Sequence, residues 1–254
     1  MKKLQAGGLA FRAGSWPADP GLPTVVFVHG SGGSGDLWHA QVRGLAGVAN
    51  TLAPDLPGHG SSAGEGMRDV GAYAGAIGGF IDAVGAENAI ICGHSLGGAI
   101  VLRLLIDHPG RYAAGILVNS GARLRVNPLI LETIENDYDG FLAGMYSAGA
   151  SEKTDPRKVR AAVEAMRFCP PEVTLGDFQA CDAFDVMGEL DRIEAPVLVL
   201  TASDDRLTPP KYGTFLAGAI GRSNLVQVED AGHLSPVEKP EDVTGAIASF
   251  VASV

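Results

Sequence analysis

The sequence predicts one α/β domain built on a mostly parallel β-sheet, with a helical insertion. Three observations predict this class. The 254 residues are enough for one substantial hydrophobic core. Short apolar runs rich in β-branched residues recur along the chain and alternate with longer helical patterns. This alternation implies crossover connections, which join parallel strands.

Several of the apolar runs are continuous, as in strands that helices cover on both faces. The expected strands lie at 24–30, 50–55, 88–93, 115–120, 196–203 and 224–230. The expected helices lie at 36–47, 69–85, 95–108, 209–219 and 239–252. The first dozen residues are expected to add one or two antiparallel edge strands.

One interval is too long for an ordinary crossover. About 75 residues separate the runs at 115–120 and 196–203. Residues 122–190 have helical patterns punctuated by prolines and glycines, and we expect them to form a cap over the carboxyl ends of the strands. Residues 1–121 and 191–254 would then form the core domain. Extra helices packed against the side of the sheet are the alternative.

Composition excludes several classes of protein. Apolar residues make up 46% and charged residues 19%, which is typical of a globular protein. The net charge of −10 argues against nucleic acid or an anionic membrane as a partner. No apolar run approaches the ~20 residues that span a bilayer, and the first residues lack a signal-peptide core. The three cysteines, Cys92, Cys169 and Cys181, lack metal-ligand spacing, so we expect buried, reduced thiols in a cytoplasmic protein.

The pattern G-x-S-x-G occurs twice, at 93–97 and 60–64, in a chain with 35 glycines, so the pattern alone decides nothing. Ser62 has no apolar run before it and no helical pattern directly after it, which is typical of a flexible turn. Ser95 follows the apolar run 89–92 and opens a strongly apolar helix. Strand, tight turn and helix are the context of a nucleophile elbow, so Ser95 is predicted to be a nucleophile.

A serine nucleophile needs a base that a carboxylate orients. Both are expected on loops after later strands. Asp204 and Asp205 follow the run 196–203, and His233 follows the run 224–230. Of the six histidines, His233 alone lies in such a place after the acid. The alternative for His233 is a loop histidine with a structural hydrogen bond.

Attack on an acyl carbon creates an oxyanion that needs two N–H donors. The amide of Leu96, directly after the nucleophile, is one candidate. The glycine-rich turn 29–35, after the strand at 24–30, is expected to supply the other. A nucleotide site is the competing interpretation of this turn, but G-x-G-x-x-G fails in register and G-K-S/T does not occur.

Together these residues resemble the α/β-hydrolase superfamily over nearly the whole chain. The matching pieces are the turn 29–35, the stretches 55–62 and 93–98, Asp205 with Pro209, and Gly232 with His233. The resemblance implies an eight-stranded, mostly parallel sheet with a helical cap after the sixth strand. It also implies that Ser95 is the nucleophile, Asp205 the acid and His233 the base, with oxyanion amides from Ser31 and Leu96. Residues 55–62 match a structural turn of the family.

The expected function is a serine hydrolase that cleaves small carboxylic esters, lactones or thioesters through an acyl-enzyme. No cofactor or metal is implied, and the expected partner is a small acyl substrate. A homodimer is compatible with the sequence, which does not identify the oligomeric state.

One alternative function is carbon–carbon bond hydrolysis of a dioxo acid, although that branch usually carries methionine at the position of Leu96. Another is a non-catalytic ligand-binding protein on the same fold. Arg123 and Arg125, where the insert begins, are expected to face solvent or stabilise the cap, and the alternative is that they pair with a substrate carboxylate.

Overall fold

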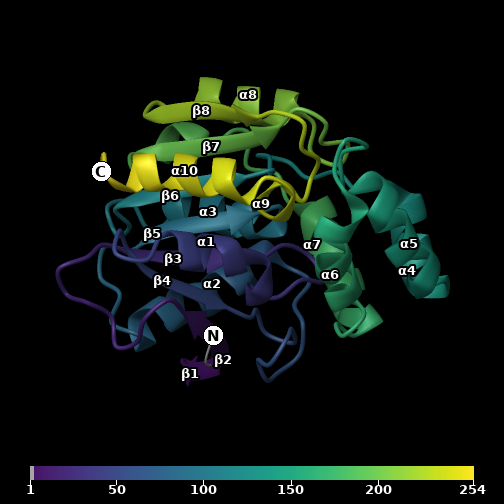
Figure 1. Cartoon of the computed structure of the whole chain (residues 1–254), viewed down its shortest axis with the longest axis horizontal. Helices are drawn as coiled ribbons and strands as arrows, with labels where there is room; N and C mark the ends of the chain where they lie inside the picture. The colour runs from purple at the N-terminus through teal and green to yellow at the C-terminus, as the bar shows by residue number, and fades with distance from the viewer. Residues whose placement is uncertain (1–2) are drawn as a thin grey trace.

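The computed structural model describes residues 3–254 and contains an eight-stranded sheet with helices on both faces (Figure 1). The strands are β1 (Lys3–Ala6), β2 (Leu9–Ala13), β3 (Thr24–Val28), β4 (Asn50–Pro54), β5 (Ile90–His94), β6 (Ala114–Val118), β7 (Val197–Ala202) and β8 (Ser223–Val228). Their order across the sheet is β1-β2-β4-β3-β5-β6-β7-β8. The pairs β1–β2 and β2–β4 are antiparallel and the others parallel.

The predicted sheet of eight mostly parallel strands is therefore confirmed. Two antiparallel edge strands form near the amino terminus, as expected. Residues 1 and 2 lie outside the described residues. Part of the prediction of edge strands, and part of the signal-peptide argument, concerns these two residues.

The helices connect these strands. The α-helices are α1 (His39–Gly44), α2 (Val70–Ala83), α3 (Leu96–Asp107), α4 (Pro128–Asn136), α5 (Tyr138–Ala148), α6 (Pro156–Met166), α7 (Pro171–Ala183), α8 (Pro210–Ala219), α9 (Ser235–Glu238) and α10 (Pro240–Val251). Short 3₁₀ turns occur at Gly35–Trp38 and Leu190–Arg192. The helix expected at 36–47 is thus a 3₁₀ turn followed by the short α1.

Each central strand contributes to two hydrophobic cores, because successive side chains of a strand point to opposite faces. On β3, Val26 and Val28 join the core that includes α2, α3 and α8. Val25 and Phe27 join the core that includes α1 and α10, which lie in front of the sheet in Figure 1. Every residue of β5 and β6 is buried. This two-sided burial explains why the central strands are continuous apolar runs.

Residues 122–190, called the helical insert below, carry α4 to α7 between β6 and β7. Figure 1 shows these helices together at one end of the sheet. The first two helices of the insert, α4 and α5, are separate because Asp137 between them leaves the helical conformation with φ −150°. Its carboxylate accepts a hydrogen bond from Gly140 N and caps α5. The division into a core domain and a cap at these bounds stays a prediction.

The three cysteines are buried and free, as the sequence predicts. Among the helices of residues 3–254, none combines the length and the apolar character needed to cross a membrane.

Candidate active site

Ser95 stands on the sharp turn between β5 and α3. Its backbone has φ 54° and ψ −118°, a conformation that costs an L-residue of order 1–3 kcal/mol and clusters at functional sites. A Cβ at Gly93 would lie 2.0 Å from the carbonyl oxygen of Gly97, and a Cβ at Gly97 would lie 2.3 Å from that of Val28. Close backbone contacts therefore require the glycines on both sides of Ser95.

Ser62, the serine of the second G-x-S-x-G match, is part of a structural turn. Its hydroxyl donates to the carbonyl oxygen of Asp55 at 2.6 Å and accepts from Ala10 N at 2.9 Å. The Asp55 carboxylate in turn accepts from Ser61 N and pairs with Arg12 at 2.6 Å. This turn ties β2 to the end of β4, as expected for a structural role.

His233 and Asp205 lie on loops after β8 and β7 and contact each other. His233 Nδ1 is 2.9 Å from Asp205 Oδ2, and both residues are buried. The same carboxylate accepts hydrogen bonds from Leu207 N and from Thr208 N and Oγ1. Burial alone would raise the pKa of the Asp205 carboxyl, but His233 and the hydrogen bonds from Asn119 and Thr208 lower it well below its usual range. Asp205 is therefore an ionised partner that holds the His233 ring.

Asp204 does not reach the histidine. Its carboxylate accepts from Ser151 Oγ at 2.6 Å and from Ser203 Oγ at 2.9 Å. Lys153 Nζ lies 3.8 Å from it at the surface. Of the two adjacent aspartates, only Asp205 contacts His233.

The glycine turn, residues 29–35 after β3, lies against the elbow. A Cβ at Gly30 would be 3.0 Å from the Cβ of Ser95. Gly33 N donates to the carbonyl oxygen of Gly30 at 3.1 Å and closes a turn that contains Ser31. Within residues 3–254, the amides of Ser31 and Leu96 make no hydrogen bond in a turn or loop or to a side chain. Both are therefore available as donors close to Ser95.

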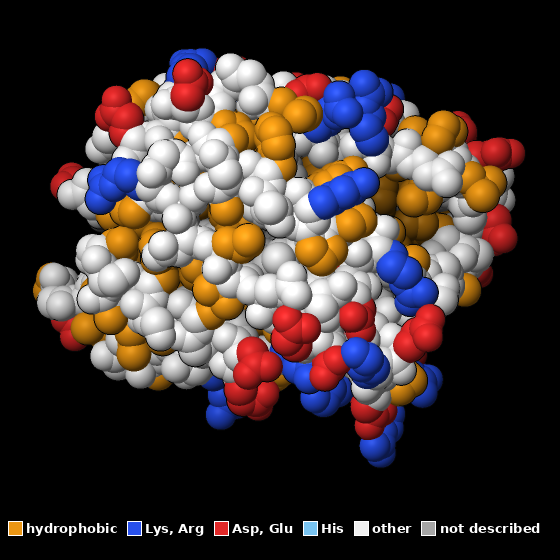
Figure 2. All heavy atoms as spheres, turned by 90° about the horizontal axis from the view of Figure 1, so that it is seen from above, with side chains coloured by type: hydrophobic (Ala, Val, Ile, Leu, Met, Phe, Trp, Pro, Cys, Tyr) orange, Lys and Arg blue, Asp and Glu red, His pale blue; other side chains and the backbone are white. Residues whose placement is uncertain are grey.

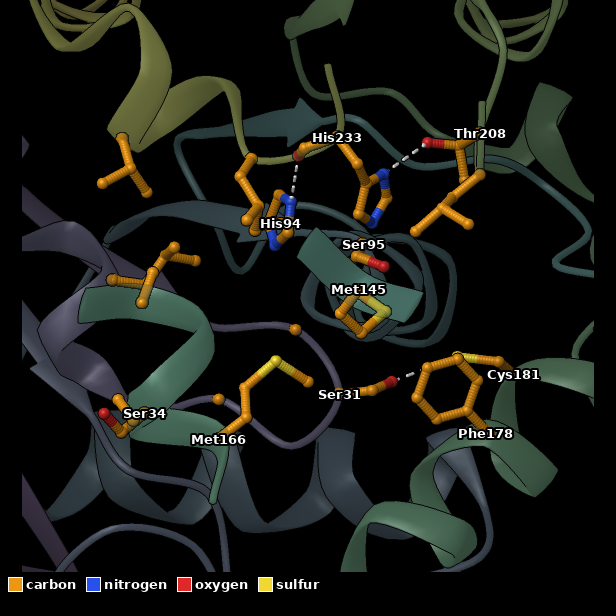
Figure 3. Close-up of a pocket in the computed structure, with 18 of the residues that line it drawn as sticks. Ser31, Ser34, His94, Ser95, Met145, Met166, Phe178, Cys181, Thr208 and His233 are labelled. Atoms are coloured by element: carbon orange, nitrogen blue, oxygen red, sulfur yellow. Dashed lines mark hydrogen bonds between the residues drawn. The ribbon is translucent and has the colours of Figure 1, made fainter. Parts of the chain in front are cut away.

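A cavity of about 350 Å³ brings these groups together (Figure 3). Ser95, His233 and Ser31 line it, and Figure 3 shows the Ser95 side chain below the His233 ring. The carbonyl oxygen of Ser95 accepts from Ser120 Oγ at 2.8 Å, whereas its hydroxyl has no hydrogen-bond partner among the described residues. Catalytic hydrogen bonds are often long before a substrate binds.

Much of the remaining wall of the cavity is apolar and comes from the helical insert. Its side chains include Ile130, Met145, Ala161, Ala165, Met166 and Phe178. Figure 2 shows hydrophobic side chains lining a hollow beside the insert, with Lys and Arg side chains near its rim. Arg125 lines the cavity, while Arg123 forms a long ion pair with Asp185 at 3.6 Å.

Asn119 is a site residue that the motifs do not predict. It follows β6 in a left-handed conformation, φ 48°. Its Nδ2 donates to Asp205 Oδ2 at 2.7 Å, and its Oδ1 accepts from Ser235 Oγ at 2.6 Å. A polar side chain directly after a buried parallel strand is the signal that could have indicated it.

His94 and His29 shape the loops around the site. His94 Nε2 lies 2.8 Å from the carbonyl oxygen of His233, and burial lowers the pKa of His94 to about 3. His29 Nδ1 lies 2.8 Å from the carbonyl oxygen of Gly30, while its Nε2 accepts from Leu56 N. Both rings are therefore neutral and link the elbow, the glycine turn and the His233 loop.

No group of three or more His, Cys, Asp or Glu side chains in residues 3–254 is arranged to hold a metal ion.

Comparison with known proteins identifies the family to which this site belongs. A family model described as "Alpha/beta hydrolase family" matches residues 25–246. The chain is similar to 3-oxoadipate enol-lactonase 1 of Acinetobacter baylyi, with 28% identity over 249 residues that cover 91% of this chain and 90% of that protein. It is also similar to a pimeloyl–acyl-carrier-protein methyl ester esterase of Neisseria meningitidis, with 27% identity over 241 residues that cover 89% of this chain and 92% of that protein.

A solved structure has the same fold. The enol-lactonase from Burkholderia xenovorans superimposes with a TM-score of 0.88 over 99% of this chain and 100% of its own, at 22% sequence identity.

Proposed function

The chain belongs to the alpha/beta hydrolase family and is an enzyme of the hydrolase class, and we propose that it cleaves small carboxylic esters, lactones or thioesters through an acyl-enzyme. In this proposal Ser95 is the nucleophile, His233 the general base and Asp205 the carboxylate that orients the base. One observation carries the proposal: His233, which shares a cavity with Ser95, has its Nδ1 2.9 Å from the buried Asp205 carboxylate. A proton on Nδ1 leaves Nε2 unprotonated and able to act as a base.

Acylation starts when Ser95 Oγ attacks the acyl carbon and His233 Nε2 takes its proton. The carbonyl oxygen becomes an oxyanion, which the amides of Ser31 and Leu96 stabilise. The ionised Asp205 stabilises the imidazolium. His233 then gives the proton to the leaving alcohol or thiol as the bond to the acyl carbon breaks. Water repeats the attack with His233 as base, and the acid leaves with Ser95 restored.

The cavity supports a compact, mostly apolar acyl group. Its volume of about 350 Å³ is near the lower end of small-molecule sites, so we expect turnover to fall beyond roughly six to eight acyl carbons. Arg125 adds a cation to this wall and favours substrates with a remote carboxylate.

Fluorophosphonate labelling and a substrate panel test the proposed function. The probe should label wild-type protein and not the Ser95→Ala variant. Among p-nitrophenyl esters from acetate to palmitate, rates should be highest for short chains, and Arg125→Ala should raise KM only for esters of dicarboxylic acids. A dioxo acid cleaved faster than every ester would instead identify a carbon–carbon bond hydrolase. Binding without labelling or turnover would identify a ligand-binding protein.

A further inference from the structure

A buried carboxylate of the helical insert contacts the glycine turn and has no part in the mechanism above. Asp177 lies on α7, and its side chain is fully buried. It accepts hydrogen bonds from Tyr73 Oη at 2.5 Å, from His59 Nε2 at 2.8 Å and from Gly32 N at 2.8 Å. Removing a carboxylate from water costs several kcal/mol, and an apolar side chain of similar size often packs at least as well. Packing alone therefore does not explain an acid here.

His59 is a cation in this cluster. Its Nδ1 lies 3.0 Å from the carbonyl oxygen of Pro57, and its Nε2 faces the Asp177 carboxylate. Because both neighbours accept hydrogen bonds, both ring nitrogens carry protons. Burial opposes this charge, but Asp177 outweighs burial and raises the pKa of His59 to about 10. The bond from Gly32 N to this carboxylate is therefore charge-assisted and about twice as strong as a neutral one.

One face of α7 covers the glycine turn. Thr174, Asp177 and Cys181 are spaced three and four residues apart, so they lie on the same side of the helix. Cys181 Sγ lies 3.7 Å from Ser31 Oγ, a contact drawn in Figure 3. Gly32 has φ +64°, and a Cβ there would lie 3.1 Å from Thr174 Oγ1. The helix therefore holds the turn by close packing and by the hydrogen bond to Asp177.

We propose that Asp177 is a positioning residue for the oxyanion hole. Its bond to Gly32 N fixes the peptide plane that follows Ser31, and the bond from Gly33 N to the Gly30 carbonyl fixes the ends of the same turn. With both constraints in place, the Ser31 amide keeps one orientation beside the nucleophile. This inference rests on the proposed function, in which that amide binds the oxyanion. The insert then contributes to turnover as well as to the pocket wall.

Two substitutions of Asp177 test this in the full-length protein with p-nitrophenyl butyrate as substrate. Asp177→Ala should misplace one oxyanion donor and lower kcat on the order of 10²-fold. KM should stay within about threefold, because the interaction lost is made only in the transition state. Asp177→Asn keeps the shape and one neutral oxygen, so its loss should be smaller, about tenfold.

Tyr73→Phe is the matched control. It removes the hydrogen bond to the other carboxylate oxygen and leaves the bond to Gly32 N intact, so kcat should stay within about twofold while stability falls. A second readout is the affinity for a boronic acid, whose tetrahedral adduct on Ser95 uses the oxyanion hole. This affinity should fall in parallel with kcat in the Asp177 variants and stay unchanged in Tyr73→Phe.

Thermal unfolding midpoints separate loss of folding from loss of positioning. The inference is overturned if folded Asp177→Ala or Asp177→Asn keeps wild-type kcat, or if Tyr73→Phe loses as much turnover as Asp177→Asn. Failure of the proposed function has a different signature: Ser95→Ala would remain active and the fluorophosphonate would not label wild-type protein.

Discussion

The two turns with the pattern G-x-S-x-G, at 93–97 and 60–64, differ in where they carry strain and in how they use the hydroxyl. In the first, Ser95 itself has φ 54°, whereas in the second Gly60 and Gly64 take the positive φ values of 54° and 93°. The hydroxyl of Ser62 makes two hydrogen bonds to backbone groups. That of Ser95 has no partner within residues 3–254 and faces the cavity.

The difference is the one expected between a reactive serine, the role proposed for Ser95, and a structural one. A hydroxyl that donates and accepts within the fold adds stability, and a glycine bears the unusual backbone angle without strain. A nucleophile needs the opposite: a hydroxyl that makes no structural hydrogen bond and faces the substrate cavity within reach of its base, on a residue whose strained backbone is fixed by its surroundings. The predictions below test this contrast.

The largest effect is expected for Ser95→Ala. Loss of the nucleophile should lower kcat by roughly 10⁴- to 10⁶-fold. The fold should be unaffected, because the hydroxyl makes no hydrogen bond among the described residues and alanine removes one atom from the cavity wall. Ester hydrolysis under saturating substrate and the thermal unfolding midpoint measure the two quantities.

Ser62→Ala is the control within the same pattern. It should leave kcat unchanged and lower the free energy of unfolding by about 1–2 kcal/mol, since two backbone groups lose a partner. If the two variants exchange these phenotypes, the assignment of roles to the two turns is wrong.

The next effect concerns the neighbours Asp204 and Asp205. Asp205→Asn should keep the geometry but favour the wrong tautomer of His233, which lowers kcat by roughly 10³- to 10⁴-fold. Asp204→Asn should cost less than about tenfold, because its contacts are Ser151 and Ser203. Steady-state kinetics at neutral pH measure both. The reverse order would transfer the role to Asp204.

Many elements of the fold, and the choice between the two aspartates, could be predicted from local sequence. The strand expected at 88–93 is β5, and the helix expected at 209–219 is α8, because buried strands and amphipathic helices have distinct periodicities. Asp205 could be chosen over Asp204 from its spacing to Pro209 in the family pattern, and it is the aspartate that contacts His233.

Contacts with the helical insert could not be predicted in this way. Asp177 is 145 residues from Gly32, and nothing near either residue indicates the other. The contact depends on how α7 packs against the glycine turn, which is decided by tertiary structure. The same holds for Asn119, whose amide reaches Asp205 across 86 residues.

The substitution Asp55→Asn tests the structural turn mainly through protein stability. The Asp55 carboxylate is fully buried and binds Arg12 Nη1 at 2.6 Å, Gly35 N at 2.8 Å and Ser61 N at 2.8 Å. Asp55→Asn breaks a buried ion pair, so the free energy of unfolding should fall by about 3–5 kcal/mol. Urea unfolding measures this loss. kcat per active site, titrated with the fluorophosphonate, should change far less than in Asp205→Asn, and an equal loss would place the turn in the catalytic step.

The last predicted effect is a pH dependence of stability that the structural turn should confer through His59. The groups that face its ring are Asp177, Tyr73, His29 and Cys169. Because Asp177 raises the pKa of His59 from 6.5 to about 10, the folded protein keeps a proton that the unfolded chain releases between these values. The stabilisation is therefore complete below pH 6.5 and declines as the pH rises towards 10, by at most about 1.4 kcal/mol per pH unit.

Urea unfolding midpoints of wild-type protein and of His59→Gln, measured from pH 6 to pH 9.5, isolate this contribution from that of other titrating groups. Glutamine fills a similar space and donates a hydrogen bond without a titrating proton. Wild-type stability should fall with pH more steeply than that of the variant, and the two curves should converge at the alkaline end. Parallel curves would mean that His59 is neutral in the folded protein and that the turn holds no buried charge pair with α7.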